Sequence, residues 1–163
     1  SSGNDNASAT PEVLVTIGGL AGATNTTGLR APTVTDMRFV VGSTAATDLT
    51  AGSSSQTITV EITYDEQVTV VGNPTVAVAN GNEGTGSGRG PYTLVYTGTG
   101  STANRLRFTL ASQTIAENDV LTLGGSNIAL AGGTISDTVV GGTTLAASLV
   151  LSGLTAVTHT VLA

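Results

Sequence analysis

The chain has 163 residues, enough for one domain or for one domain with an extended arm. Its five basic residues, all arginine, stand against eleven acidic residues and give a net charge of −6, which argues against nucleic-acid binding through clustered cations. The absence of cysteine excludes disulfides and thiolate metal sites, and no apolar stretch approaches the ~18 residues that predict membrane insertion.

The first thirty residues predict an N-terminal arm, residues 1–30. Small polar residues make up 1–10, and 18–30 is a connector rich in Gly, Thr and Asn. Between them, 12–17 is a short apolar run that predicts a strand. We expect it to add a strand to a neighbouring sheet, with partner contacts through Val13, Leu14, Val15 and Ile17. The alternative is an extra edge strand on its own domain.

Residues 31–163 predict an all-β domain beginning near Pro32, a residue suited to the start of an edge strand. The chain has 30 Thr, 18 Val and 22 Gly, a composition typical of short strands joined by tight turns. The clearest signal is Thr57–Tyr64, where apolar and polar residues alternate. Turn signals recur about every eight to twelve residues and favour a single antiparallel β-sandwich. The predicted strands are 34–41, 57–64, 68–71, 75–79, 92–97, 106–110, 120–123, 128–130, a strand at 135, 145–151 and 158–162, with a long turn at 43–55.

Residues 80–91 are the most glycine-rich segment and predict a mobile loop, with Gly at 81, 84, 86, 88 and 90. Arg89 in this loop is a candidate partner-contact residue. A phosphate-binding role is not supported, because the segment has neither the lysine nor the following helix of a P-loop.

Three charged residues are predicted to point away from the core. Glu61 lies among alternating apolar residues, and Arg105 and Arg107 alternate with apolar residues of the next long strand. The two arginines are expected on a solvated face or paired with an acidic neighbour. A glycosidase-like carboxylate pair involving Glu61 is not supported, because aromatic residues that would line a sugar subsite are scarce.

The remaining polar groups do not predict catalysis or a metal site. Asp65-Glu66 and the segment 117–119 are the local acidic groups, and neither has the spacing of a calcium loop, so they predict turns. The single histidine, His159, has no G-x-S-x-G nucleophile motif to accompany it and is expected to face solvent or an interface. We therefore expect no catalytic residues, no metal ligands, no cofactor and no enzymatic activity.

From Ala31 onward the chain resembles one Ig-like β-sandwich repeat of large bacterial surface proteins and adhesins. The matching pieces are APTVT at 31–35, TITVEITYDEQVTVVGNPTVAV at 57–78, YTGTGSTANRLRFTL at 96–110, IALAGGTISDT at 128–138 and LVLSGL at 149–154. Such repeats usually occur in tandem, whereas this chain holds one copy behind its own arm. The resemblance implies an Ig-like fold and assigns no chemistry.

A single Ig-like domain with an arm resembles the accessory proteins that decorate or cement phage particles. This resemblance implies a non-enzymatic structural protein on the virion exterior, bound to the major capsid protein, another virion structural protein or copies of itself, with loops facing solvent or host-surface glycans. The alternative is a secreted prokaryotic adhesin, filament or surface-layer subunit that is extracellular or on the cell surface. A carbohydrate-binding module is a third class, and the absence of Trp counts against it.

Overall fold

The structure is a computed structural model that describes residues 31–41, 44–45, 52–138 and 144–162. In this part of the chain every regular element is a strand, so the all-β class predicted from the sequence is confirmed. The predicted arm, including Val13, Leu14, Val15 and Ile17, lies outside the described residues. The strands are β1 (Val34–Val41), β2 (Thr44–Ala45), β3 (Gly52–Tyr64), β4 (Val68–Val71), β5 (Thr75–Asn80), β6 (Tyr92–Thr97), β7 (Arg105–Ile115), β8 (Val120–Leu123), β9 (Thr134–Asp137) and β10 (Val157–Thr160).

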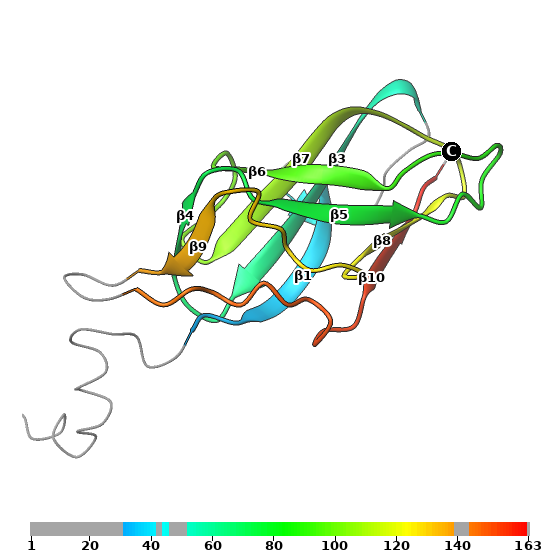
Figure 1. The fold of residues 1–163 in the computed structure, drawn as a ribbon. Coiled ribbons are helices and arrows are strands. Elements are labelled where there is room, and N and C mark those ends of the chain that lie inside the picture. Colours follow the sequence, from blue (N-terminus) through cyan, green and yellow to red (C-terminus); the bar gives the residue numbers. More distant parts are fainter. Residues whose placement is uncertain (1–30, 42–43, 46–51, 139–143, 163) are drawn as a thin grey trace, which may run out of the picture.

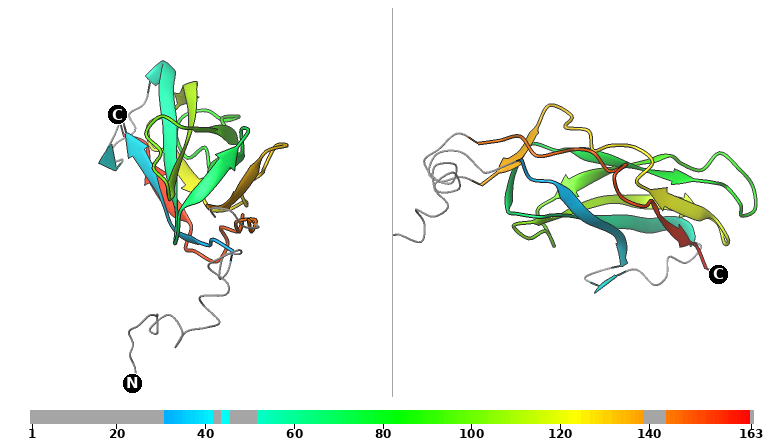
Figure 2. Two further views of the ribbon diagram at one scale, coloured as in Figure 1. Left: turned by 90° about the vertical axis from the view of Figure 1, so that its left-hand side faces the viewer. Right: turned by 90° about the horizontal axis from the view of Figure 1, so that it is seen from below.

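The described strands form one large sheet and one small sheet, both antiparallel. The large sheet has the order β10-β8-β5-β6-β7-β3-β1-β2, and β4 pairs with β9 in the small one. The large sheet curls until β1 and β10, near opposite ends of its strand order, lie side by side (Figures 1 and 2). At this closure the rings of Phe39 and His159 lie 5.8 Å apart between centroids.

The curl encloses a core made mostly of aliphatic side chains. In β3 the alternation found in the sequence sends Ile58, Val60, Ile62 and Tyr64 inward, each no more than 1% exposed. Burying each such aliphatic side chain stabilises the fold by roughly 1.5–3 kcal/mol. The Tyr64 hydroxyl donates to the Ser148 carbonyl at 2.9 Å, and burial raises the pKa of Tyr64 above its usual value. Other core residues are Phe39, Val76, Val78, Leu94, Leu106, Phe108, Leu121, Leu123, Ile135 and Leu151.

Three segments differ from the sequence prediction. The strand predicted at 145–151 is absent from the described structure, which shows one bridge there, between Ala146 and Ser136. The reason is a change of partner: the Ala147 amide donates to β9, whereas the Ser148 amide donates to the Pro32 carbonyl before β1. Residues 128–130 likewise form one bridge, and the predicted turn at 43–55 is shortened because β2 lies within it and β3 begins at Gly52.

The two ends of the molecule differ. The small sheet lies at the end where the described chain begins, at Ala31, and the 81–90 loop lies at the other end, near the C-terminus (Figure 1). The N-terminal end of the described chain is therefore far from the glycine-rich loop.

Candidate functional site

Three arginines surround one carboxylate on the outer face of the sheet formed by β1, β3 and β7. Glu61 is in register with Arg38 of β1 on one side and with Arg107 of β7 on the other. The Nε and Nη2 groups of Arg38 donate to Glu61 Oε1 at 3.0 and 2.8 Å. Those of Arg107 donate to Oε2 at 3.1 and 2.5 Å. Arg105, two residues before Arg107, places its Nε 3.4 Å from Oε1. We call these four residues the arginine cluster.

The cluster holds Glu61 in its charged form although the side chain is only 1% exposed. Burial raises the pKa of Glu61, but hydrogen bonds from Arg107 and Arg38 and the charges of Arg105 and Arg107 outweigh it, so the pKa of Glu61 falls below its usual value. The sequence prediction that Glu61 points away from the hydrophobic core is correct. For Arg105 and Arg107, the pairing alternative is confirmed, and a simple solvated face is wrong for Arg107, which is 13% exposed.

The cluster has more cations than its buried carboxylate needs. Three guanidinium groups against one carboxylate leave a local charge of 3 − 1 = +2. The side chains of Arg38 and Arg105 remain 39% and 40% exposed. The Nε of Arg105 is a buried donor with no hydrogen-bond partner in the part of the chain that the structure describes. The donors on the outer side of the cluster are therefore the Nη groups of the part-exposed Arg38 and Arg105 that Glu61 does not use.

A second ion pair fastens the glycine-rich loop. Arg89 donates from Nε and Nη2 to the two oxygens of Asp119, at 2.6 and 2.7 Å. Asp119 is fully buried and also accepts from Asn80 Nδ2 at 2.8 Å and from the amides of Gly84 and Ala116, both at 3.0 Å. The hydrogen bonds from Arg89 dominate, and despite burial they hold the pKa of Asp119 far below its usual value.

This pairing changes the interpretation of Arg89. The loop is not the loosely attached segment that its composition predicts, because Asn82 also bonds the Arg89 amide and carbonyl at 3.0 Å. The side chain of Arg89 is 12% exposed, and its guanidinium is paired with Asp119. Partner contact through Arg89 stays a prediction, and the structure assigns its guanidinium an anchoring role. The turn predicted around 117–119 is present, with the Asp119 amide donating to the Ala116 carbonyl at 3.0 Å.

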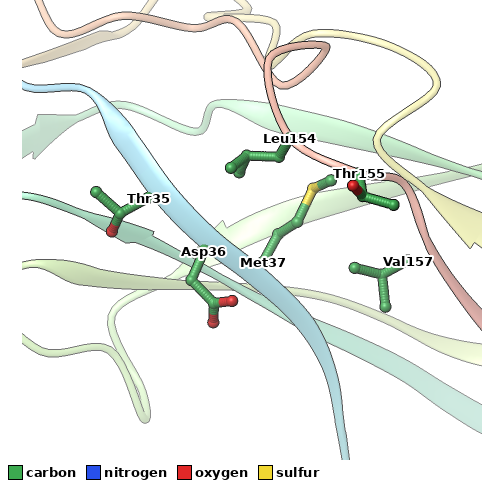
Figure 3. Close-up of a pocket in the computed structure, with 6 residues that line it drawn as sticks. All are labelled: Thr35, Asp36, Met37, Leu154, Thr155 and Val157. Atoms are coloured by element: carbon green, nitrogen blue, oxygen red, sulfur yellow. The ribbon is translucent and has the colours of Figure 1, made fainter.

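A groove of about 200 Å³ separates β1 from the chain leading into β10. Met37 points into it toward Leu154 and Thr155, whereas Asp36 points to the opposite side of β1 (Figure 3). Along its first half β1 pairs with β3 alone among the described strands, and β10 pairs with β8 alone. Two strand edges thus face each other across the groove. It is lined by Thr35, Asp36, Met37, Leu154, Thr155 and Val157.

The other polar residues singled out from the sequence do not converge. Within 31–41, 52–138 and 144–162, no group of three or more His, Asp or Glu side chains is placed to hold a metal ion. Asp137 is buried; its Oδ1 accepts from the Leu145 amide at 2.7 Å, and its Oδ2 has no partner in the described structure. No helix in the same part of the chain is long and apolar enough to cross a membrane.

Comparison of the chain with family models, curated proteins and solved structures gives no match. The resemblance to Ig-like repeats therefore stays a prediction from the residues.

Proposed function

We propose that this chain is a non-enzymatic structural protein that attaches to a larger assembly through its arm and the open edges of its sheet. The setting that its sequence resemblance favours is the exterior of a phage particle, where the partner is the capsid protein, another virion protein or a second copy. The observation that carries the proposal is the groove between β1 and the chain before β10, where two strand edges face each other.

Open strand edges favour attachment because their backbone groups pair readily with an added strand. The arm supplies such a strand in its apolar run at 12–17. The connector at 18–30 spans at most about 47 Å when extended, which is long enough for the run to bind beyond its own domain or at the groove beside β1. One such contact is weak alone, and many copies on one lattice bind cooperatively.

The positions of the arm and the 81–90 loop at opposite ends of the domain suit this arrangement. The arm joins the domain at the end that carries the small sheet, and the 81–90 loop lies at the other end (Figure 1). A domain anchored by its arm presents that loop outward. The Arg89–Asp119 pair then keeps the loop in one shape without a partner.

The test is the assembly state of the full chain against a variant carrying Val13→Asn and Val15→Asn, measured by light scattering. These substitutions keep the length of the chain, change no residue of the predicted domain 31–163, and remove the apolar side of the predicted strand. A matched control carries Thr24→Asn and Thr26→Asn in the connector. We expect both variants and the unaltered chain to be folded monomers. We expect only the Val13/Val15 variant to lose binding to purified phage particles.

Other outcomes redirect the proposal. Polymers that disappear only in the Val13/Val15 variant favour the alternative, a secreted prokaryotic surface subunit that assembles by strand exchange. A Val13/Val15 variant that is monomeric but much less stable than the control shows that the run pairs with its own domain, and the proposed external attachment through the arm is then wrong.

A further inference from the structure

We propose that the arginine cluster (Arg38, Arg105 and Arg107 around Glu61) is a binding site for a carboxylate group of an acidic protein segment. The cluster holds three of the four arginines in the described residues of an acidic chain. It therefore forms a local basic patch on a protein whose net charge is −6. The inference does not depend on the arm, because none of the four cluster residues belongs to residues 1–30.

The arginines of the cluster have N–H donors that Glu61 does not use. A guanidinium carries five N–H groups, and Arg38 directs only its Nε and one Nη toward Glu61. Arg105 makes an ion pair at 3.4 Å without hydrogen-bond geometry, which leaves its buried Nε–H without an acceptor in the described structure. That buried Nε–H stays against Glu61, so the groups left for an incoming carboxylate are the remaining Nη N–H groups of Arg38 and Arg105, whose side chains are 39% and 40% exposed. Arg107 is engaged with Glu61 and sets the position of that carboxylate.

The charges around the cluster favour an anion but limit its affinity. Asp36 is exposed and lies two residues before Arg38 on the same side of β1. Counting Asp36, the local charge falls from +2 to +1. The other neighbours across the strands are neutral: Thr63 is in register with both Asp36 and Arg105, and Thr97 is in register with Arg107. A single carboxylate thus meets a net attraction that salt weakens.

An acidic protein segment fits this face better than an acidic glycan. Sugar recognition commonly uses exposed aromatic rings as stacking platforms. The three tyrosines of the chain do not supply one here: Tyr64 and Tyr92 are buried, and Tyr96 packs edge-on against Phe108 at 6.1 Å. The planar guanidinium fork matches a carboxylate, as its pairing with Glu61 already shows.

The experiment titrates the isotope-labelled full chain with a peptide of five Gly-Glu repeats and follows the arginine Nε–H signals by NMR. A peptide of five Gly-Gln repeats is the neutral control. We expect saturable shifts of the Arg38 and Arg105 signals with the acidic peptide alone, and weaker binding as salt is raised. Arg105→Gln should weaken binding about two- to five-fold.

Two further variants separate a site from a general charge effect. Arg30→Gln changes the net charge by the same amount as Arg105→Gln, but Arg30 is not one of the four cluster residues, and this variant should leave binding unchanged. Asp36→Asn removes the competing carboxylate and should tighten binding about two- to five-fold. If the cluster were purely structural, Arg105→Gln and Asp36→Asn would not change peptide binding in opposite directions. Among the described residues the ion pairs of Arg38, Arg105 and Arg107 go to Glu61 and not to Asp36, so Asp36→Asn also keeps the test decisive if Arg105→Gln fails to fold.

Three outcomes would overturn the inference. The first is the absence of saturable shifts at millimolar peptide. The second is equal binding by the Arg105→Gln and Arg30→Gln variants. The third is tighter binding of a sulfated oligosaccharide than of the acidic peptide, which would assign the cluster to a glycan instead.

Discussion

Replacing Glu61 by Gln should destabilise the fold more than the same type of substitution at any other carboxylate on the outer face of the sheet. The substitution removes the charge that three arginines face, while the shape of the side chain is almost kept. Arg107 is 13% exposed and loses a close, largely desolvated partner, which costs about 2 kcal/mol. Arg38 and Arg105 are about 40% exposed, so solvent screens their loss, which adds roughly 0.5 kcal/mol each. The expected total is therefore about 3 kcal/mol.

The assay is urea unfolding at neutral pH, with Glu117→Gln as the matched control. Glu117 is exposed, so the same chemical change there should cost less than about 0.5 kcal/mol. A cost for Glu61→Gln within that same range would refute the view that Glu61 joins β1, β3 and β7 electrostatically.

The effect of Glu61 also has a defined dependence on pH. Because the pKa of Glu61 is lower in the folded chain than in the unfolded chain, its contribution is complete above the unfolded value, about 4.5. It is lost as the pH falls from there through the lower folded pKa. The difference in stability between the unaltered chain and Glu61→Gln should therefore shrink below about pH 4.5. A difference that stays constant down to the acid transition would contradict this explanation.

Three further outcomes follow from the packing. Asp119→Asn should cost about 3 kcal/mol, since Arg89 loses its counter-charge; thermal unfolding measures this, and a cost below 1 kcal/mol would show that the loop anchors itself otherwise. Gly133→Ala should destabilise by about 1–3 kcal/mol because its Cβ would lie 2.2 Å from the Val71 carbonyl oxygen, and an unchanged melting temperature would show that the small sheet yields easily. Ile62→Ala should cost about 2–5 kcal/mol in urea unfolding; a smaller loss would mean that the core closes around the cavity.

Local periodicity explains which parts of the fold could be predicted from the sequence. In Thr57–Tyr64 the alternation of apolar and polar residues fixes both the strand and its inward face, and the structure confirms both. The segment 145–151 has a higher apolar content, six of seven residues, but no regular strand. Its backbone partners change from β9 to Pro32 within two residues, and such a change depends on distant segments rather than on local composition.

The charged sites were harder to predict because they depend on register. Alternation correctly placed Glu61, Arg105 and Arg107 outside the hydrophobic core. Their convergence requires β3 to align with strands whose arginines are 23 and 46 residues away, and irregularities in pairing shift that alignment. Likewise, Arg89 and Asp119 are separated by 30 residues, and nothing in the glycine-rich composition of the loop indicates that its arginine turns inward.

The way the chain enters β1 has a mechanical consequence for a protein held by its arm. At this entrance Thr33 donates from its amide and its hydroxyl to Asp65, at 2.9 and 2.7 Å. A pull transmitted from Ala31 along β1 would therefore act first on these two hydrogen bonds between Thr33 and Asp65. For a pull directed along β1, the hydrogen-bonded ladder to β3 and the Arg38–Glu61 pair would be loaded together. Under such a pull, these contacts would resist the separation of β1 from the rest of the sheet.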